Sequence, residues 1–144
     1  MFLKGTLNNE IEIGPSKFIT DIEVEEIKSH NMQIDSIDML IKSPWIMVKG
    51  TKYKPKMVLA LNIQENELPK FCIIEQIFLY NNKYVIFKCS ELETIMFDEH
   101  IFSYEVKVEN SYQFVYHHML PSFIPNNINI LPNGYKYVTL RSSI

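Results

Sequence analysis

The sequence predicts a mainly β fold, a small antiparallel barrel-like domain with one N-terminal helix. From Trp45 to Val108 the chain consists of short apolar runs separated by Pro, Asn-Asn and acidic turns. This stretch is rich in β-branched and aromatic residues, which favour strands. A length of 144 residues suffices for one domain with its own core. We expect residues 1–44 to form a strand and helix segment that packs on a β-barrel-like domain of residues 45–144.

The composition indicates a folded, intracellular protein. The chain is 47% hydrophobic and 22% charged, which is typical of globular domains and not of disordered ones. Its net charge of −3 gives no overall attraction to phosphates, so nucleic-acid binding would need a local basic patch. The first residues, MFLKGTLNNE, lack the apolar core of a signal peptide, and no run approaches the ~18 apolar residues of a membrane span. We therefore expect a nuclear or cytoplasmic protein that does not contact membranes.

The N-terminal part predicts one strand and one helix. Glu10–Ile13 alternates polar and apolar residues before Gly14-Pro15, as a short strand followed by a turn does. Thr20 and Glu23 have the spacing of a capping box, so we expect a helix from about Thr20 to His30. Residues 34–44 fit either a helix or a strand, and Pro44 ends the element in both cases.

Asn81-Asn82 predicts a tight hairpin between two apolar strands, because Asn tolerates positive φ. A two-residue loop sets a register in which the facing pairs are Tyr80 and Lys83, Phe78 and Val85, and Ile74 and Cys89. In that register Cys72, Ile74, Phe78 and Tyr80 share one face, and the opposite face is also largely apolar. The hairpin should therefore lie in the centre of the fold, covered on both sides.

The C-terminal part predicts further strands. Residues 102–108 alternate apolar and polar side chains, which indicates a strand with one solvated face. Residues 112–117 indicate a second strand, and the Pro- and Asn-rich residues 121–132 an extended loop. Asn133-Gly134 should then turn the chain into a last strand at residues 135–140.

The sequence gives no metal, cofactor or catalytic motif. The potential zinc ligands are Cys72, Cys89, His100, His117 and His118. They lack the short-range spacing of zinc modules, so we interpret the two cysteines as buried core residues. Asp98-Glu99-His100 holds the minimum for proton transfer, but such triplets are also common in solvated turns. With no nucleophile motif and no phosphate-binding glycine loop, we expect a protein that is not an enzyme.

Aromatic residues are dense in the central stretch and allow two interpretations. They can fill a core, or they can form a binding face for cations or for stacked bases. The aromatic binding candidates are Trp45, Tyr53, Tyr80, Tyr84 and Tyr104.

A lysine cluster lies in KGTKYKPK, from Lys49 to Lys56. Lys52, Lys54 and Lys56 alternate, so an extended strand would place them on one face with Tyr53 opposite. They could contact phosphates, or they could protect a solvated strand edge.

Four phrases in order carry a resemblance to a known group of proteins: KGTKYKPKMVLAL, ELPKFCIIEQIF, KCSELETIMFDEHIFSYEV and YKYVTLRSSI. From about Trp45 to Ile144 the chain resembles a β-rich C-terminal region of uncharacterised animal proteins related to DNA transposons, often found after zinc-finger or transposase-like segments. The resemblance implies a small SH3-, Tudor- or BAH-like barrel and a mobile-element origin, without catalytic residues. Two features depart from it: Cys72 stands where a small residue is expected, and no zinc finger precedes the region. The chain thus looks like the terminal module or a domesticated fragment.

Two functions follow from these observations. The first is a non-catalytic interaction module of transposon origin, which binds a protein partner or a second copy through an aromatic face or a strand edge. The alternative is a nucleic-acid-binding accessory domain that uses Lys49–Lys56 and nearby aromatic residues.

Overall fold

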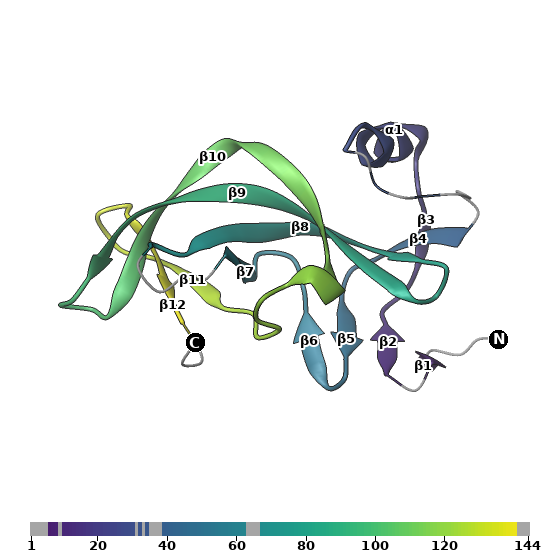
Figure 1. Ribbon diagram of the computed structural model, residues 1–144, viewed down its shortest axis with the longest axis horizontal. Coiled ribbons are helices and arrows are strands. Elements are labelled where there is room, and N and C mark those ends of the chain that lie inside the picture. The colour runs from purple at the N-terminus through teal and green to yellow at the C-terminus, as the bar shows by residue number, and fades with distance from the viewer. Residues whose placement is uncertain are drawn as a thin grey trace.

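Figure 1 shows the computed structural model of the chain, which describes residues 6–8, 10–30, 32, 34, 39–62 and 67–140. Within these residues the chain forms twelve strands, one α-helix and one short 3-10 helix. In chain order they are β1 (Thr6–Asn8), β2 (Ile11–Ile13), β3 (Lys17–Phe18), α1 (Asp21–Ser29), β4 (Leu40–Ser43), β5 (Ile46–Val48), β6 (Thr51–Tyr53), β7 (Val58–Asn62), β8 (Lys70–Tyr80), β9 (Tyr84–Asp98), β10 (Ser103–Tyr116), η2 (His117–Met119), β11 (Asn127–Ile130) and β12 (Lys136–Thr139).

The strands form two antiparallel sheets. The small sheet has the order β1-β2-β5-β6, and the large sheet has the order β11-β12-β10-β9-β8-β4-β3, with β7 also paired to β8. Because β2 pairs with β5 and β4 pairs with β8, both sheets combine strands from residues 1–44 and 45–144. The expectation of a mainly β, antiparallel fold with one N-terminal helix is confirmed.

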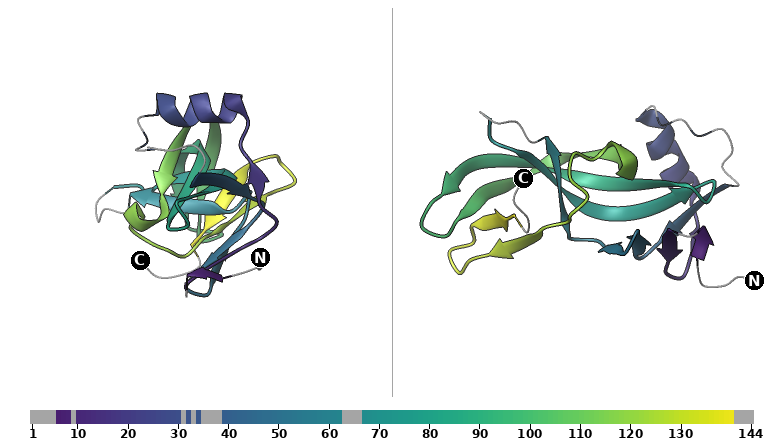
Figure 2. Two further views of the ribbon diagram at one scale, coloured as in Figure 1. Left: turned by 90° about the vertical axis from the view of Figure 1, so that its right-hand side faces the viewer. Right: turned by 60° about the horizontal axis from the view of Figure 1, so that its bottom comes forward.

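The described strands form no closed barrel, so the expectation of a barrel-like domain is confirmed only as an antiparallel β fold. Among the described strands neither sheet closes: β1 and β6 are the edges of the small sheet, and β11 and β3 those of the large one. β8, β9 and β10 have 11, 15 and 14 residues and form a long curved arch, visible in Figures 1 and 2. Each short strand pairs with only part of a long one, and the edge strands β11 and β3 do not pair with each other, so the large sheet stays open. The sequence predicts five to seven strands around the core, and these short strands raise the number among the described residues to twelve.

The β8–β9 hairpin lies in the centre of the fold and is covered on both faces, as expected. One face packs against the small sheet, where Cys72, Ile74 and Phe87 meet Ile46 and Tyr53 in a single buried cluster. The other face packs under α1, in a second cluster that joins Ile27 of the helix to residues of the large sheet: Leu40, Phe78, Tyr80, Ile86 and Phe114. A third cluster, around Phe71 and Val106, fills the end of the large sheet near β12.

The hairpin register differs from the predicted one beyond its middle. The loop has three residues, Asn81–Lys83, so Tyr80 faces Tyr84 and Phe78 faces Ile86. A β-bulge between Ile74 and Gln76 restores the predicted pairing of Ile74 with Cys89. The bulge also reverses the alternation, because it moves Ile77 and Leu79 onto the face of Cys72 and Ile74. Phe78 and Tyr80 therefore point to the opposite face, under α1.

The predicted helix is confirmed as α1, with His30 as its C-cap. Both bonds of the capping box are present: Thr20 Oγ1 accepts the Glu23 N–H, and Glu23 accepts the Thr20 N–H at 2.9 Å. Ile27 is fully buried against the sheet. Two ion pairs connect α1 to the large sheet: Lys42 of β4 donates to Glu23 at 2.6 Å, and Lys88 of β9 donates to Glu26 at 3.0 Å.

The remaining strand predictions were confirmed in part. The predicted strand at Glu10–Ile13 is β2, and residues 34–44 contain the strand β4, although residues 35–38 lie outside the described part. The two strands predicted at residues 102–108 and 112–117 form one strand, β10, which begins at Ser103, ends at Tyr116 and carries two irregularities in its pairing with β9. The expected loop at 121–132 contains β11. The turn at Asn133-Gly134 and the last strand, β12, are confirmed.

Candidate functional site

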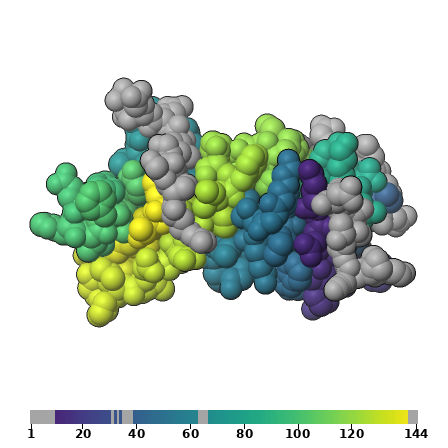
Figure 3. All heavy atoms as spheres, turned by 90° about the horizontal axis from the view of Figure 1, so that it is seen from below, coloured from purple at the N-terminus to yellow at the C-terminus, as the bar shows by residue number. Residues whose placement is uncertain are grey.

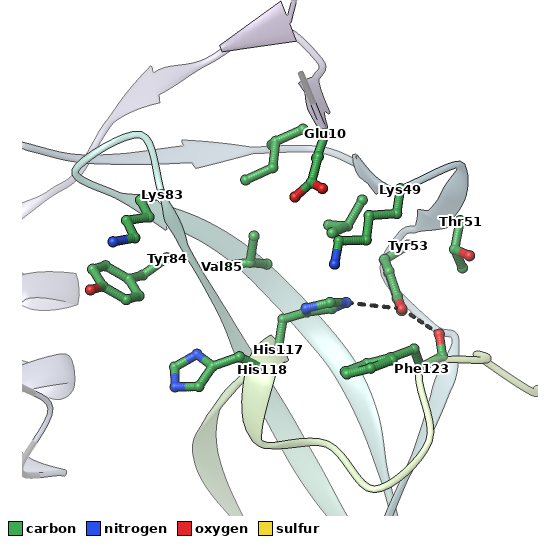
Figure 4. A pocket seen from close by; sticks show the side chains of 12 residues that line it. Glu10, Lys49, Thr51, Tyr53, Lys83, Tyr84, Val85, His117, His118 and Phe123 are labelled. Carbon is green, nitrogen blue, oxygen red and sulfur yellow. Dashed lines mark hydrogen bonds between the residues drawn. The ribbon is translucent and has the colours of Figure 1, made fainter. Parts of the chain in front are cut away.

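A pocket of about 590 Å³ lies where the small sheet meets the start of β9 and the segment after β10. We call it the junction pocket, and Figure 4 shows its side chains. Its volume is within the range of ligand-binding pockets. It is lined by Glu10, Ile11, Val48, Lys49, Thr51, Tyr53, Lys83, Tyr84, Val85, His117, His118 and Phe123.

Two tight turns place lysines on the rim of the junction pocket. Lys49 and Gly50 connect β5 and β6 with φ values of 50° and 85°, as the two-residue turns of hairpins require. The Lys49 N–H also donates to the Glu10 carbonyl at 2.8 Å, which ties this turn to the residue before β2. Lys83 ends the β8–β9 loop, and its Nζ lies 5.3 Å from the centre of the Tyr84 ring.

His117 lies at the base of the junction pocket in a hydrogen-bonded chain. The Tyr53 hydroxyl donates to the Phe123 carbonyl, and it lies 3.2 Å from His117 Nε2. The Phe123 ring stacks on the imidazole at a centroid distance of 4.8 Å. Figure 4 shows these three residues together below Lys49.

This chain of bonds determines which nitrogen of His117 carries the proton. A carbonyl can only accept, so the single hydroxyl proton of Tyr53 is committed to Phe123. His117 Nε2 must then donate to the Tyr53 oxygen, which leaves Nδ1 unprotonated in the neutral ring. Since no buried side-chain nitrogen or oxygen of the described residues lacks a partner, and Nδ1 has no bonded partner, this atom is open to solvent.

The local electrostatics keep this arrangement neutral. Burial lowers the pKa of His117, and the charges of His118 and Lys49 lower it further. Burial raises the pKa of Tyr53 to about 12, so its hydroxyl keeps its proton at neutral pH. The junction pocket therefore offers a neutral hydrogen-bond acceptor, Nδ1, below cationic lysines.

These residues can bind an anion, accept a hydrogen bond and pack on an apolar group. Lys49 and Lys83 supply positive charge, and the carboxylate of Glu10 is the opposing charge in the lining. Ile11, Val48 and Val85 supply an apolar wall. Among the described residues, no group of three or more His, Cys, Asp or Glu side chains could hold a metal ion.

Of the residues that the sequence marked as binding candidates, Lys49, Tyr53 and Tyr84 line the junction pocket. Tyr53 is fully buried, so it contributes its hydroxyl and not an exposed stacking surface. Trp45 and Lys52 do not line the pocket and instead contact each other, with Lys52 Nζ 4.8 Å from the indole ring.

The predicted row of lysines on one strand face is wrong. β6 ends at Tyr53, so Lys54 and Lys56 lie beyond it, and Lys56 has a φ of 79° in a turn. Lys56 pairs with Glu75 at 2.8 Å, whereas Lys52 points to Trp45. Pro55 lies between Lys54 and Lys56 and the chain turns there, which removes the alternation that an extended strand would have.

Tyr80 and Tyr104 also lie away from the junction pocket. Tyr80 is buried in the cluster below α1 and stacks on Tyr84 at 6.5 Å. Tyr104 is half-buried on β10, where it packs between Phe71 and Phe97. Cys72 and Cys89 are fully buried free thiols in the core.

The end of the β9–β10 hairpin is a second notable feature; we call Asp98–Phe102 the hairpin tip. Phe102 has a φ of 53° and is 76% exposed, which is unusual for a bulky apolar residue in both respects. Asp98 Oδ1 accepts the His100 N–H at 2.9 Å, so the predicted acid–base triplet forms a turn. Neither Asp98 nor His100 lines the junction pocket.

Sequence reasoning missed most of the polar residues in the junction pocket. The sequence presents His117 only as a possible metal ligand and Lys83 only as a hairpin residue, and it indicates no binding role for Glu10 or Phe123. A lysine at the end of the Asn81-Asn82 turn was the signal that could have pointed to a binding rim. Nothing local to His117 indicates that it meets Tyr53, 64 residues earlier.

Comparisons of the chain with protein-family models, curated proteins and solved structures found no match. The resemblance to transposon-related proteins and to SH3-, Tudor- or BAH-like modules therefore stays a prediction from the quoted phrases. Among the described residues, no helix is long and apolar enough to cross a membrane.

Proposed function

We propose that this chain is a non-catalytic interaction module that binds a protein partner through the junction pocket. The partner presents a short segment in which an acidic side chain stands beside an aromatic or aliphatic one. The observation that supports this most directly is the placement of Lys49 and Lys83 above an apolar wall.

The lining matches each part of such a segment. A carboxylate gains charge-assisted hydrogen bonds from Lys49 and Lys83. An apolar side chain packs on Val48 and Val85 and on the ring of Phe123, and loses its contact with water. A backbone N–H of the partner can donate to His117 Nδ1, which is neutral and has no bonded partner among the described residues.

This proposal narrows the one made from the sequence. It keeps a protein partner and aromatic contacts, and it assigns the site to the junction of the two sheets in place of an aromatic face or a strand edge. The lining residues include a single acid, Glu10, and a single aliphatic hydroxyl, Thr51. They include no acid pair, and no hydrogen bond among the described residues joins the Thr51 hydroxyl to His117 or His118 as a nucleophile and its base. The transposon origin is part of the proposal through the sequence resemblance alone.

Fluorescence anisotropy with short labelled peptides tests the proposal. A peptide with a Glu-X-Phe core should bind, and a Lys-X-Phe peptide should not. Lys83→Glu should weaken binding at least about tenfold, because like charges then meet at the rim. Lys107→Glu is the matched control, since Lys107 is exposed on β10 and outside the pocket lining. Equal binding of both peptides, or equal loss in both variants, would refute the proposal.

Nucleic-acid binding is the second candidate, and the same rim supports it. Lys49 and Lys83 could contact phosphates, while Tyr84 and Phe123 could stack on bases. Single-stranded DNA and RNA belong in the same assay, across a salt series. Nucleic-acid affinity that falls steeply with salt would favour this candidate over a peptide ligand, provided that Lys83→Glu also abolishes the binding.

A further inference from the structure

The hairpin tip, at the other end of β9 from the junction pocket, carries the chemistry that this pocket is proposed to bind. We propose that the tip of one copy occupies the junction pocket of a second copy, so that the chain associates with itself head to tail. This inference rests on the proposed function and names the partner of that site.

The hairpin tip supplies an apolar group that is held ready for binding. Phe102 packs edge-on against Phe97 at 5.6 Å, and Phe97 packs against Tyr104 at 4.9 Å. Tyr104 in turn contacts the buried Phe71 at 5.7 Å. A line of rings thus runs from the core to an exposed side chain, with exposed Ile101 beside it. Because this support restricts Phe102 before binding, little further order is lost when it enters a pocket.

The charges at the two ends are complementary. Asp98 and Glu99 stand beside Phe102 at the tip, and the bond from the His100 N–H fixes the Asp98 carboxylate. The junction pocket presents Lys49 and Lys83 against one carboxylate, that of Glu10. A second copy that inserts Phe102 against the apolar wall therefore brings Glu99 close to the lysine rim.

A chain cannot place its own tip in its own pocket. β9 begins at Tyr84, which lines the junction pocket, and it ends at Asp98 in the hairpin tip. The fifteen residues of β9 that lie between these sites correspond to roughly 45 Å along the strand at about 3.3 Å per residue. Figures 1 and 3 show the β9–β10 end projecting beyond the rest of the molecule, clear of β5 and β6.

The association is heterologous, because different surfaces of the two copies meet. A dimer keeps one free tip and one free pocket, so the assembly can grow into short chains or close into a ring. A tip inserted in a pocket is a small interface, so the association should be weak and concentration-dependent.

Sedimentation velocity of the full chain tests this directly, from about 10 μM to about 1 mM, where small interfaces dissociate. The sedimentation coefficient of the wild type should rise with concentration. Phe102→Gly should abolish the rise, and it should fold well because glycine accepts the positive φ of this position. Lys83→Glu should abolish it too, whereas Lys107→Glu, with the same change of charge, should behave as the wild type. A wild type that stays monomeric throughout, or two variants that associate like it, would overturn the inference.

Mixing the two blocked variants separates a head-to-tail contact from a symmetric one. The Lys83→Glu chain keeps its tip and the Phe102→Gly chain keeps its pocket, so a mixture should form dimers and nothing larger. A mixture that stays monomeric while the wild type associates would contradict the pairing of tip and pocket. If acidic peptides bind in a Lys83-dependent way while the wild type stays monomeric, the proposed function stands and this inference fails.

Discussion

Replacing Tyr53 with Phe is the sharpest test of the proton arrangement at His117. The change removes one hydroxyl group and keeps the buried ring, which packs on Phe87 at 5.2 Å. The Phe123 carbonyl loses its donor and His117 Nε2 loses its acceptor. At about 1 kcal/mol for each bond, and with water able to reach the pocket side of His117, we expect a loss of about 1–2 kcal/mol. For a chain of this length, Tm should fall by about 3–6 °C.

Two measurements check this prediction. Urea unfolding followed by the fluorescence of Trp45, the only tryptophan, gives the free energy of unfolding. Nitrogen-15 NMR of the His117 ring gives the tautomer, which should carry its proton on Nε2 in the wild type and should lose this preference in Tyr53→Phe. A wild-type ring with its proton on Nδ1 would refute the reasoning, and so would a variant as stable as the wild type with an unchanged tautomer.

Four further predictions concern other parts of the chain. Gly14→Ala should cost about 1–3 kcal/mol in urea unfolding, because its methyl group would lie 2.6 Å from Trp45 Nε1; an unshifted Trp45 emission would contradict this. Burial raises the pKa of Glu23, but bonds from Lys42 and Thr20 lower it overall, so its contribution to stability is present above pH 4.5 and lost as the pH falls below that value. Glu23→Gln should therefore cost about 2 kcal/mol at pH 7, a difference that unfolding at pH 3 should no longer show. The pKa of His117 is lowered from 6.5, so the neutral ring contributes stability above pH 6.5 that is lost as the pH falls toward the folded-state value. His118→Ala should raise that pKa in an NMR titration, and an unchanged or lowered pKa would count against the pocket electrostatics. A hydrogen bond with Cys72 and burial raise the pKa of the Cys89 thiol. Both thiols are also fully buried, so neither should react with a disulfide reagent until the chain unfolds. Rapid labelling of the native protein would contradict this buried placement.

The parts of the fold that the sequence predicted correctly are those with local causes. The capping box of Thr20 and Glu23 begins α1 because both bonds form within one turn of chain. Asn133-Gly134 turns the chain because Gly134 accepts a φ of 88°. The central position of the β8–β9 hairpin followed from its apolar residues on both faces.

The same apolar faces explain why the hairpin register could not be predicted. Register is specified when one face is polar, since a slip would then expose apolar residues. In β8 a slip of one residue exchanges Ile77 for Phe78. Because both are apolar, the sequence pattern does not show which of them faces which side. The third loop residue, Lys83, shifts the register by one residue, and the bulge after Ile74 reverses that shift. The alternation of residues in the sequence indicates neither feature.

The junction pocket illustrates a stronger limit, because its chemistry depends on contacts between distant segments. The alternating lysines and Tyr53 suggested a strand with a basic face, and that reasoning treated the tyrosine as the side chain opposite the site. The turn at Lys49-Gly50 instead brings Lys49 over the same pocket into which the Tyr53 hydroxyl faces. The role of Tyr53 then arises only from its long-range bond to Phe123, which leaves Nδ1 of His117 as the acceptor. A residue type and its spacing can thus indicate where a binding site lies, while the direction of its hydrogen bonds requires the tertiary contacts.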